Sequence, residues 1–252
     1  MNLVFKDDIK GAEFRLIINK STFDKSFLVK NRNANMLSIA WNNGESQKVT
    51  IDEIEYTFPA NSILPLMVNQ FFYFERPEEI IAWQFNRDFY CIVNHDHEVS
   101  CVGFIFYGSS QPMFIKLNRN EKAKIISLLQ AFKDEFNITD NIQCEMLRIL
   151  LVRFIITITR LAKQQFVSSD DIENTKFNLF RLFNLMVENN YRVQHEVKFY
   201  ASELNKSPKT LANTFALYGQ KTPLQIIQER IVLEAKRLFY YTDKSAKEIA
   251  FE

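Results

Sequence analysis

Short runs of β-branched and aromatic residues mark the first half of the chain. Such residues favour pleated backbone, and five runs occur before residue 116: Val49–Ile51, Ile54–Phe58, Phe71–Phe74, Phe89–Val93 and Val102–Tyr107. Many short strands at close spacing are typical of a β-sandwich or β-barrel. We therefore predict an N-terminal β domain over residues 1–116.

Turn residues separate these runs. The tripeptide 42–44, with the sequence Asn-Asn-Gly, suits a hairpin because Asn and Gly tolerate a positive φ. Pro59, Pro65 and Pro77 are expected to interrupt strand pairing, since proline has no N–H to donate to a ladder.

From about Asn118 the apolar residues recur with the period of a helix. The first helix is indicated by four residues at helical spacing: Ile125, Leu128, Leu129 and Phe132. A second is expected from about Ile142 to Gln165. A third follows residues 168–171, where Ser and Asp provide an N-cap and acids in the first turn, and ends near residue 190.

One face of the predicted 142–165 helix carries an apolar stripe, namely Leu147, Leu150, Leu151, Phe154, Ile158 and Leu161. Such a stripe fits either a dimer contact or the intrachain core, and we expect a dimer contact. Within this predicted helix, the apolar stretch is interrupted by three charged residues, Arg148, Arg153 and Arg160. Because a charge at the bilayer centre costs roughly 2.5–3.5 kcal/mol, they argue against a membrane span. Residues 117–190 are thus predicted to be a helical dimerisation region.

The composition is that of a globular protein, and a β-rich first half followed by helices predicts the α+β class. It is 47% hydrophobic and 24% charged over 252 residues, with a formal net charge of +1. Residues 191–252 hold 10 Lys and Arg against 7 Asp and Glu, so the C-terminal part is slightly basic. Three cysteines without a CxxC pair and no apolar leader predict a cytoplasmic protein with reduced thiols.

Local turn chemistry in the C-terminal part predicts two short helices joined by a tight turn. The first spans Val197–Leu204, and the second runs from Pro208 to about Leu217. Asn205 falls where a left-handed residue is needed, which Asn accepts. Ser207 is a good N-cap, and Pro208 follows at the first helical position, where its missing N–H costs nothing.

The residues between these two helices are suited to close packing. Ala201 is small at the expected crossing point, and Tyr200, Leu204, Leu211 and Phe215 are placed to fill the space around it. Two short helices joined in this way form a helix-turn-helix, whose second helix can enter a major groove of DNA. A further helix is expected from Thr222-Pro223 to about Tyr241.

The segment 224–238 resembles the linker helix of AraC/XylS-type bacterial regulators, and 242–252 resembles the start of their second helix-turn-helix. The resemblance implies a DNA-binding domain over 191–252, a cupin-like β sensor domain and a dimerising helical pair. It also implies double-stranded DNA, RNA polymerase, a second copy of the chain and a small-molecule effector as partners. We expect the second motif to be incomplete, because the sequence stops at Glu252.

By this resemblance, the exposed face of the second helix would contact DNA. Lys209 and Asn213 would reach base edges, and Ala212 would offer an apolar contact such as one to a thymine methyl group. Lys206 and Thr210 would hold phosphates, which supports affinity rather than sequence choice. The rival interpretation is an interaction fragment that dimerises without binding DNA stably.

Two further interpretations concern the β domain. His95 and His97, with Glu98 or Cys101, have the i, i+2 spacing that a metal-binding cupin uses. Metal-binding cupins have a Gly several residues before the two histidines and a Glu about four residues after them. Here that Gly is missing and Glu98 follows His97 directly, so we expect a polar loop and no metal. Four aromatic residues fit either a ligand pocket or plain core: Trp41, Tyr56, Phe58 and Trp83. The sequence has no Gly-rich phosphate loop, nucleophile elbow or HExxH motif, so we expect neither an enzyme nor a cofactor.

Overall fold

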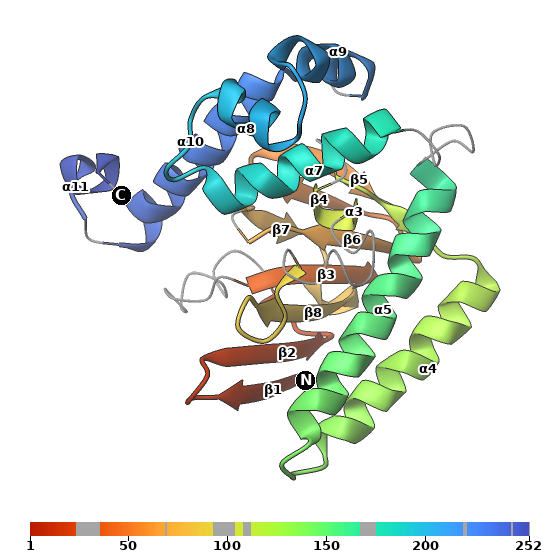
Figure 1. The fold of residues 1–252 in the computed structure, drawn as a ribbon. Helices are drawn as coiled ribbons and strands as arrows, with labels where there is room; N and C mark the ends of the chain where they lie inside the picture. Colours follow the sequence, from red (N-terminus) through yellow and green to blue (C-terminus); the bar gives the residue numbers. More distant parts are fainter. Residues whose placement is uncertain are drawn as a thin grey trace. The chain divides into compact units, whose positions relative to one another are not determined.

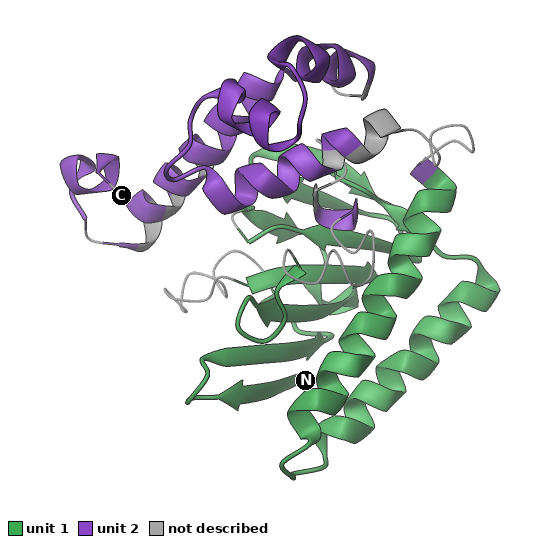
Figure 2. Cartoon of the chain, viewed as in Figure 1, with its two compact units in different colours: residues 1–102, 112–165 green, residues 103–111, 166–252 purple. Residues whose placement is uncertain are grey.

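A computed structural model describes residues 1–23, 36–68, 70–92, 104–107, 112–166, 175–218, 221–242 and 244–251. By its internal contacts the chain divides into two compact units (Figure 2). Unit 1 comprises Met1–Val102 and Pro112–Gln165, and unit 2 comprises Gly103–Gln111 and Phe166–Glu252.

Unit 1 contains two antiparallel sheets and two long helices (Figure 1). The larger sheet has the order β1-β2-β8-β3-β6-β9 and the smaller one β5-β4-β7. The strands are β1 Asn2–Asp7, β2 Ala12–Ile18, β3 Met36–Asn42, β4 Gln47–Ile51, β5 Ile54–Phe58, β6 Ser62–Leu66, β7 Phe72–Phe74, β8 Ile80–Asn86 and β9 Ile115–Lys116. Among the described strands no pairing joins the two sheets into a closed barrel, so the arrangement is a sandwich.

Each face of the larger sheet is covered. On one face, Ile17, Ala40 and Ala82 share a buried core with residues of the smaller sheet such as Val49 and Phe74. The other face meets α4 Arg119–Phe136 and α5 Gln143–Phe166, which run side by side in Figure 1. The rings of Trp83 and Phe154 lie 4.3 Å apart there, and those of Phe14 and Phe132 lie 5.5 Å apart.

Burial on both faces explains why the sequence pattern missed β3 and β8. Strands β3 and β8 have buried side chains along almost their whole length, so their apolar and polar residues do not alternate. Strands β4, β5 and β7 include an exposed side and match the predicted runs 49–51, 54–58 and 71–74 closely.

Two predicted strands are wrong within the described residues. Phe89 lies in a turn after β8, and Phe104–Tyr107 forms a short helix, α3. Phe104, Ile105 and Phe106 are all buried, which explains why the run is apolar without being a strand. A buried run of this length does not distinguish a strand from a helical turn by periodicity alone.

The predicted turn positions are also corrected. Residues 42–44 lead from one sheet to the other rather than forming a hairpin, because β3 pairs with β6 and β8 while β4 pairs with β5 and β7. The hairpin lies at Asp52 and Glu53, which both have a positive φ and join β4 to β5. Pro65 lies inside β6, at a position where β9 no longer runs alongside.

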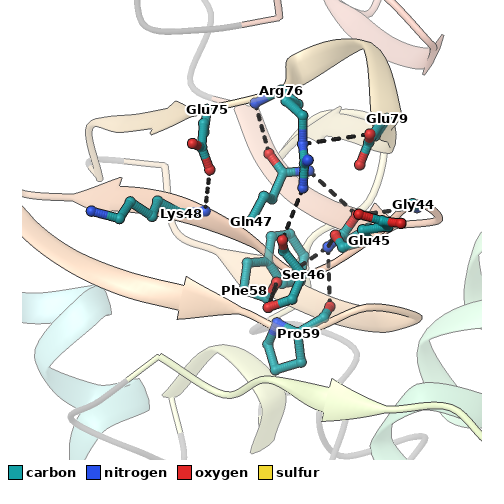
Figure 3. Close-up of polar contacts among 11 residues, drawn as sticks. Gly44, Glu45, Ser46, Gln47, Lys48, Phe58, Pro59, Glu75, Arg76 and Glu79 are labelled. Atoms are coloured by element: carbon teal, nitrogen blue, oxygen red, sulfur yellow. Dashed lines mark hydrogen bonds and ion pairs between the residues drawn. The ribbon is translucent and has the colours of Figure 1, made fainter.

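A network of hydrogen bonds links the two sheets where the chain passes from one to the other (Figure 3). The buried amide of Asn42 donates to the carbonyl oxygens of Glu45, Phe58 and Pro59 at 2.7, 3.2 and 3.1 Å. Its Oδ1 accepts from the Gln47 amide at 3.3 Å, whose own Oε1 accepts from the backbone N–H of Arg76 at 2.9 Å. The crossing is fixed because every polar atom of these two amide side chains has a partner.

The predicted apolar stripe of α5 packs inside unit 1. Leu147, Leu151, Phe154 and Ile158 are fully buried within one chain and Leu161 is 8% exposed, while Leu150 is intermediate. Of the two interpretations that the sequence left open for this stripe, the burial favours intrachain core. The opposite face of α5 exposes Met146 and Ile149, and Ile142, just before the helix, is exposed beside them.

Unit 2 is helical, and it starts earlier than the predicted DNA-binding region. Its longer elements are α7 Thr175–Asn190, α8 Val197–Glu203, α9 Pro208–Tyr218, α10 Pro223–Tyr241 and α11 Ala246–Ala250. The predicted 117–190 region is divided between the units, since α4 and α5 join the sheets and α7 joins the helices. The reason is that Leu179, Phe180 and Phe183 of α7 share a core with Leu211 and Phe215 of α9.

Candidate nucleic-acid interface

The turn between α8 and α9 is built by its own sequence. Asn205 has a φ of 52°, the left-handed conformation expected of it. Backbone bonds close the turn, since the Asn205 N–H donates to the Ser202 carbonyl and the Lys206 N–H to the Ala201 carbonyl, both at 2.9 Å. These bonds satisfy carbonyl groups that the end of a helix would leave unpaired.

Helix α9 then begins at Pro208, with Ser207 as its N-cap. The Ser207 Oγ accepts from the Thr210 backbone N–H at 3.1 Å and lies 2.9 Å from the Thr210 hydroxyl. Pro208 occupies the first helical position, where no N–H is needed. The predicted start of the second helix is therefore confirmed by its cap geometry.

The predicted contact between the two helices is also present. Ala201 is buried at the crossing, with Tyr200, Leu211 and Phe215 fully buried beside it. The ring of Tyr200 lies 5.3 Å from that of Phe183, and its hydroxyl donates to the Gln194 carbonyl at 2.7 Å. Burial of this phenol raises the pKa of Tyr200 to about 12. Helix α7 therefore packs against both α8 and α9.

Packing leaves the other face of α9 open. Lys206, Lys209, Thr210, Ala212 and Asn213 are all exposed. Lys209, Ala212 and Asn213 are spaced at i, i+3 and i+4, which places them on one side of α9, and Lys206 lies in the turn just before the helix. Four of the five residues that the sequence nominated therefore lie exposed on α9, and the fifth, Lys206, is exposed in the turn before it.

An ion-pair network, which sequence reasoning missed, fastens α10 to α7. The guanidinium of Arg230 donates to both carboxylate oxygens of Glu188, at 2.7 and 2.9 Å, and to Glu234 at 3.3 Å. It also stacks 3.8 Å from the centroid of the Tyr191 ring. Arg192 donates to the second oxygen of Glu234 at 2.9 Å.

Burial alone lowers the pKa of Arg230, but the hydrogen bonds and charge of Glu188 outweigh it and leave the pKa raised. The i, i+4 pair of Arg230 and Glu234 is visible in the sequence. Glu188 stands 42 residues away along the chain, and nothing in the sequence marks it as a partner.

The segments after α9 start as the sequence predicts. Thr222 caps α10 in a reciprocal capping box with Gln225, and Pro223 takes the first helical position. Ser245 and Glu248 form a second box at the start of α11. The side-chain hydrogen bond from Ser245 lowers the pKa of Glu248. Both starts agree with the predicted helix from 222 and the predicted motif opening over 242–252.

The other candidate residues have plainer outcomes. His95, His97, Glu98 and Cys101 lie outside the described residues. Within the described ranges no group of three or more His, Cys, Asp or Glu is arranged to hold a metal ion. No described helix is both long and apolar enough to cross a membrane. Trp41, Phe58 and Trp83 are fully buried and Tyr56 packs against the core of unit 1, so packing accounts for the nominated aromatics.

Comparison with known proteins gives few matches. No family model matches the sequence, and no curated protein does. Among solved structures, an apo variant of ToxT from Vibrio cholerae strain SCE256 is 14% identical, with 100% of this chain and 86% of that chain covered and a TM-score of 0.42. Wild-type ToxT with bound unsaturated fatty acid is 15% identical over 85% of this chain and 76% of that one, with a TM-score of 0.44.

A third structure, the AraC-like transcriptional activator CuxR, is 12% identical over 89% of this chain and 73% of that chain, with a TM-score of 0.33. Similarity at this level establishes neither a common family nor a common function. The function therefore has to be inferred from the residues of this chain.

Proposed function

We propose that this chain is a transcription regulator that binds double-stranded DNA sequence-specifically through α9. One observation carries the proposal: α9 is capped, buried on one side and exposed on the side that holds Lys209 and Asn213. A rigid helix with a polar, cationic outer face has the shape and chemistry that reads a major groove.

The chemistry of each exposed residue indicates whether it contacts a base or a phosphate. Lys209 donates to guanine acceptors, and Asn213 pairs with adenine through its donor and acceptor. Ala212 contacts a thymine methyl group. Lys206 and Thr210 hold phosphates, which fixes the register of the helix on the duplex without choosing the sequence.

The experiment is a fluorescence anisotropy titration of the full chain against a pool of duplex fragments, followed by sequencing of the bound fraction. A regulator binds more weakly as salt rises, because neutralising phosphates releases counterions. We expect an enriched sequence and a negative slope of log affinity against log salt. Binding that shows no enrichment over the pool, or none at low salt, would refute the proposal.

Single substitutions separate the two roles. Lys209→Ala or Asn213→Ala is expected to cost about 1–3 kcal/mol on the enriched sequence and to relax the choice of one base pair. Lys206→Ala is expected to weaken all sequences alike and reduce the salt slope by about one. Lys124→Ala, an exposed lysine of α4, removes the same charge from unit 1 and serves as the matched control.

Dimerisation remains part of the proposal, but through different residues from those first nominated. Because the Leu147–Leu161 stripe is buried in its own chain, a second copy would meet the outer face of α5, where Met146 and Ile149 are 42% and 61% exposed. Sedimentation of the wild type at micromolar concentration should show a dimer that Ile149→Asp dissociates. If the wild type sediments as a monomer, the proposal that the chain dimerises is wrong.

The same measurements decide the rival function. A chain that dimerises through α5 but shows no enrichment of any DNA sequence is an interaction fragment. RNA polymerase and a small effector belong to the proposal as the partners of a regulator, and they are tested only after DNA binding is established.

A further inference from the structure

The inner face of the large sheet carries a row of buried polar side chains. Arg15 of β2, Gln84 of β8 and Ser38 of β3 stand directly opposite one another in register. Residues in register on neighbouring strands point to the same face, with Cβ atoms about 5 Å apart. This is the face on which Ala82 and Ala40, the next row, join the apolar core between the sheets. All three polar side chains are buried, at 5%, 0% and 1% exposure.

This row has a surplus of positive charge. The Arg15 Nε donates to the Glu13 Oε1 at 2.6 Å, and Lys6 approaches the same oxygen at 3.6 Å. Two cations therefore share one carboxylate. The Arg15 side chain is only 6% exposed, and a buried charge that lacks full pairing is costly.

The donor fork of Arg15 is largely unused. In the part of the chain that the structure describes, its Nε bond to Glu13 is the only hydrogen bond of this guanidinium. The two terminal nitrogens form the planar fork that matches a carboxylate, and they are left without such a partner.

In the same row, the side-chain oxygen of Gln84 is a hydrogen-bond acceptor without a donor. Its amide nitrogen donates to the Ser38 hydroxyl at 2.9 Å, but its Oε1 is buried and has no hydrogen-bond partner. Asn42 and Gln47 in the same unit are also buried, and their amide atoms are all bonded. Gln84 therefore differs from Asn42 and Gln47, because one of its buried amide atoms has no hydrogen-bond partner. Leaving a buried polar atom unsatisfied costs about 1–3 kcal/mol.

We propose that Arg15, Gln84 and Ser38 bind a small carboxylate that carries a hydroxyl or ammonium group on the neighbouring carbon. The fork of Arg15 takes the carboxylate in a bidentate pair. The hydroxyl or ammonium group donates to Gln84 Oε1, and Ser38 holds the Gln84 amide in place through its hydrogen bond. The apolar residues Ala82 and Ala40 lie beside this row on the same face of the sheet.

The test uses the full chain without DNA, so its outcome does not depend on the proposed function. Lactate, alanine and propionate are compared as probes at equal ionic strength, with sodium chloride as the blank. Lactate supplies a hydroxyl, alanine an ammonium group, and propionate neither. Both tryptophans, Trp41 and Trp83, lie in unit 1, so thermal unfolding followed by their fluorescence reports on the unit that holds the site.

Ligand that binds only the folded state raises its stability. At a concentration tenfold above Kd we expect a rise in Tm of about 3–5 °C, for lactate or alanine and not for propionate. The one that acts identifies the donor group. No shift with either, or an equal shift with propionate, would overturn the proposal.

Two variants locate the effect. Arg15→Gln should abolish the shift with every probe, and Gln84→Met should remove the advantage over propionate while leaving a nearly isosteric side chain in the core. Arg160→Gln removes an exposed arginine of α5 and should leave the shifts unchanged. If Arg15→Gln fails to fold, Gln84→Met still decides, because a retained advantage in that variant contradicts the proposed role of Oε1.

Discussion

Helices α5 and α9 each carry a face that the sequence marks as a contact surface, and the structure treats the two faces in opposite ways. The apolar stripe of α5 is covered by its own sheet, with Phe154 against Trp83. The polar face of α9, including Lys209 and Asn213, stays exposed. Periodicity locates a face of a helix, but it does not reveal what covers that face.

The difference follows from the chemistry of the two faces. An apolar stripe is stabilised by any apolar partner, whether it belongs to the same chain or to another. A face of Lys, Thr and Asn gains little from burial, because each polar group would need a partner inside. The sequence therefore predicts exposure of α9 more securely than it predicts the partner of α5.

The largest expected effect tests whether the apolar stripe of α5 is part of the core of unit 1. Phe154→Ala should destabilise unit 1 by about 3–5 kcal/mol, because it removes a fully buried ring and leaves a cavity. Denaturant unfolding followed by tryptophan fluorescence measures it. Ile149→Ala, at an exposed position of the same helix, should change stability by less than about 0.5 kcal/mol. Equal small effects would mean that the stripe is not core.

A smaller effect tests whether the ion pair of Glu188 and Arg230 holds α7 to α10. Glu188→Ala removes the bidentate partner of the buried Arg230 and should destabilise unit 2 by about 1.5–3 kcal/mol. Hydrogen exchange of Pro223–Tyr241 should become faster. Glu229→Ala breaks the exposed pair with Lys221 and should cost less than about 1 kcal/mol. No change in exchange after Glu188→Ala would separate α7 from this unit.

The buried phenol of Tyr200 gives unit 2 an alkaline limit. Because its pKa is raised from 10 to about 12 in the folded state, the contribution to stability is fully present below pH 10 and is lost as pH rises through 12. Far-UV circular dichroism over this range should show loss of helix. The loss should become less steep in Tyr200→Phe but not in Tyr73→Phe, an exposed control.

The smallest expected effect concerns the cap of α9. Ser207→Ala should cost about 1 kcal/mol, since the Thr210 N–H loses its acceptor. Hydrogen exchange in the first turn of α9 should accelerate, and sequence choice on DNA should be retained. Ser202→Ala, on the exposed side of α8, should leave that exchange unchanged. Unaltered exchange in Ser207→Ala would show that Pro208 alone fixes the helix start.

The helix starts of unit 2 could be predicted from the sequence better than the central strands of unit 1. The reason is that a helix cap depends on neighbouring residues, whereas the pattern of a strand depends on what covers its two faces. Every helix start that depends on a cap and a proline was readable, as at Ser207-Pro208 and Thr222-Pro223. The strands that lie between two layers were not, since residues 36–42 and 80–86 lack alternation. Alternation reports a half-buried strand, and these strands are buried on both faces.

By itself the sequence determined the turn between α8 and α9 and the start of α9, because Asn205, Ser207 and Pro208 act on the backbone within a few residues of themselves. Only the tertiary structure decided which layer covers α5, that Glu188 pairs with Arg230, and that Arg15 lies opposite Gln84. Those contacts join residues far apart in the chain, and many partners would satisfy their chemistry equally. The choice among partners depends on how strands register and layers pack, which no local pattern encodes.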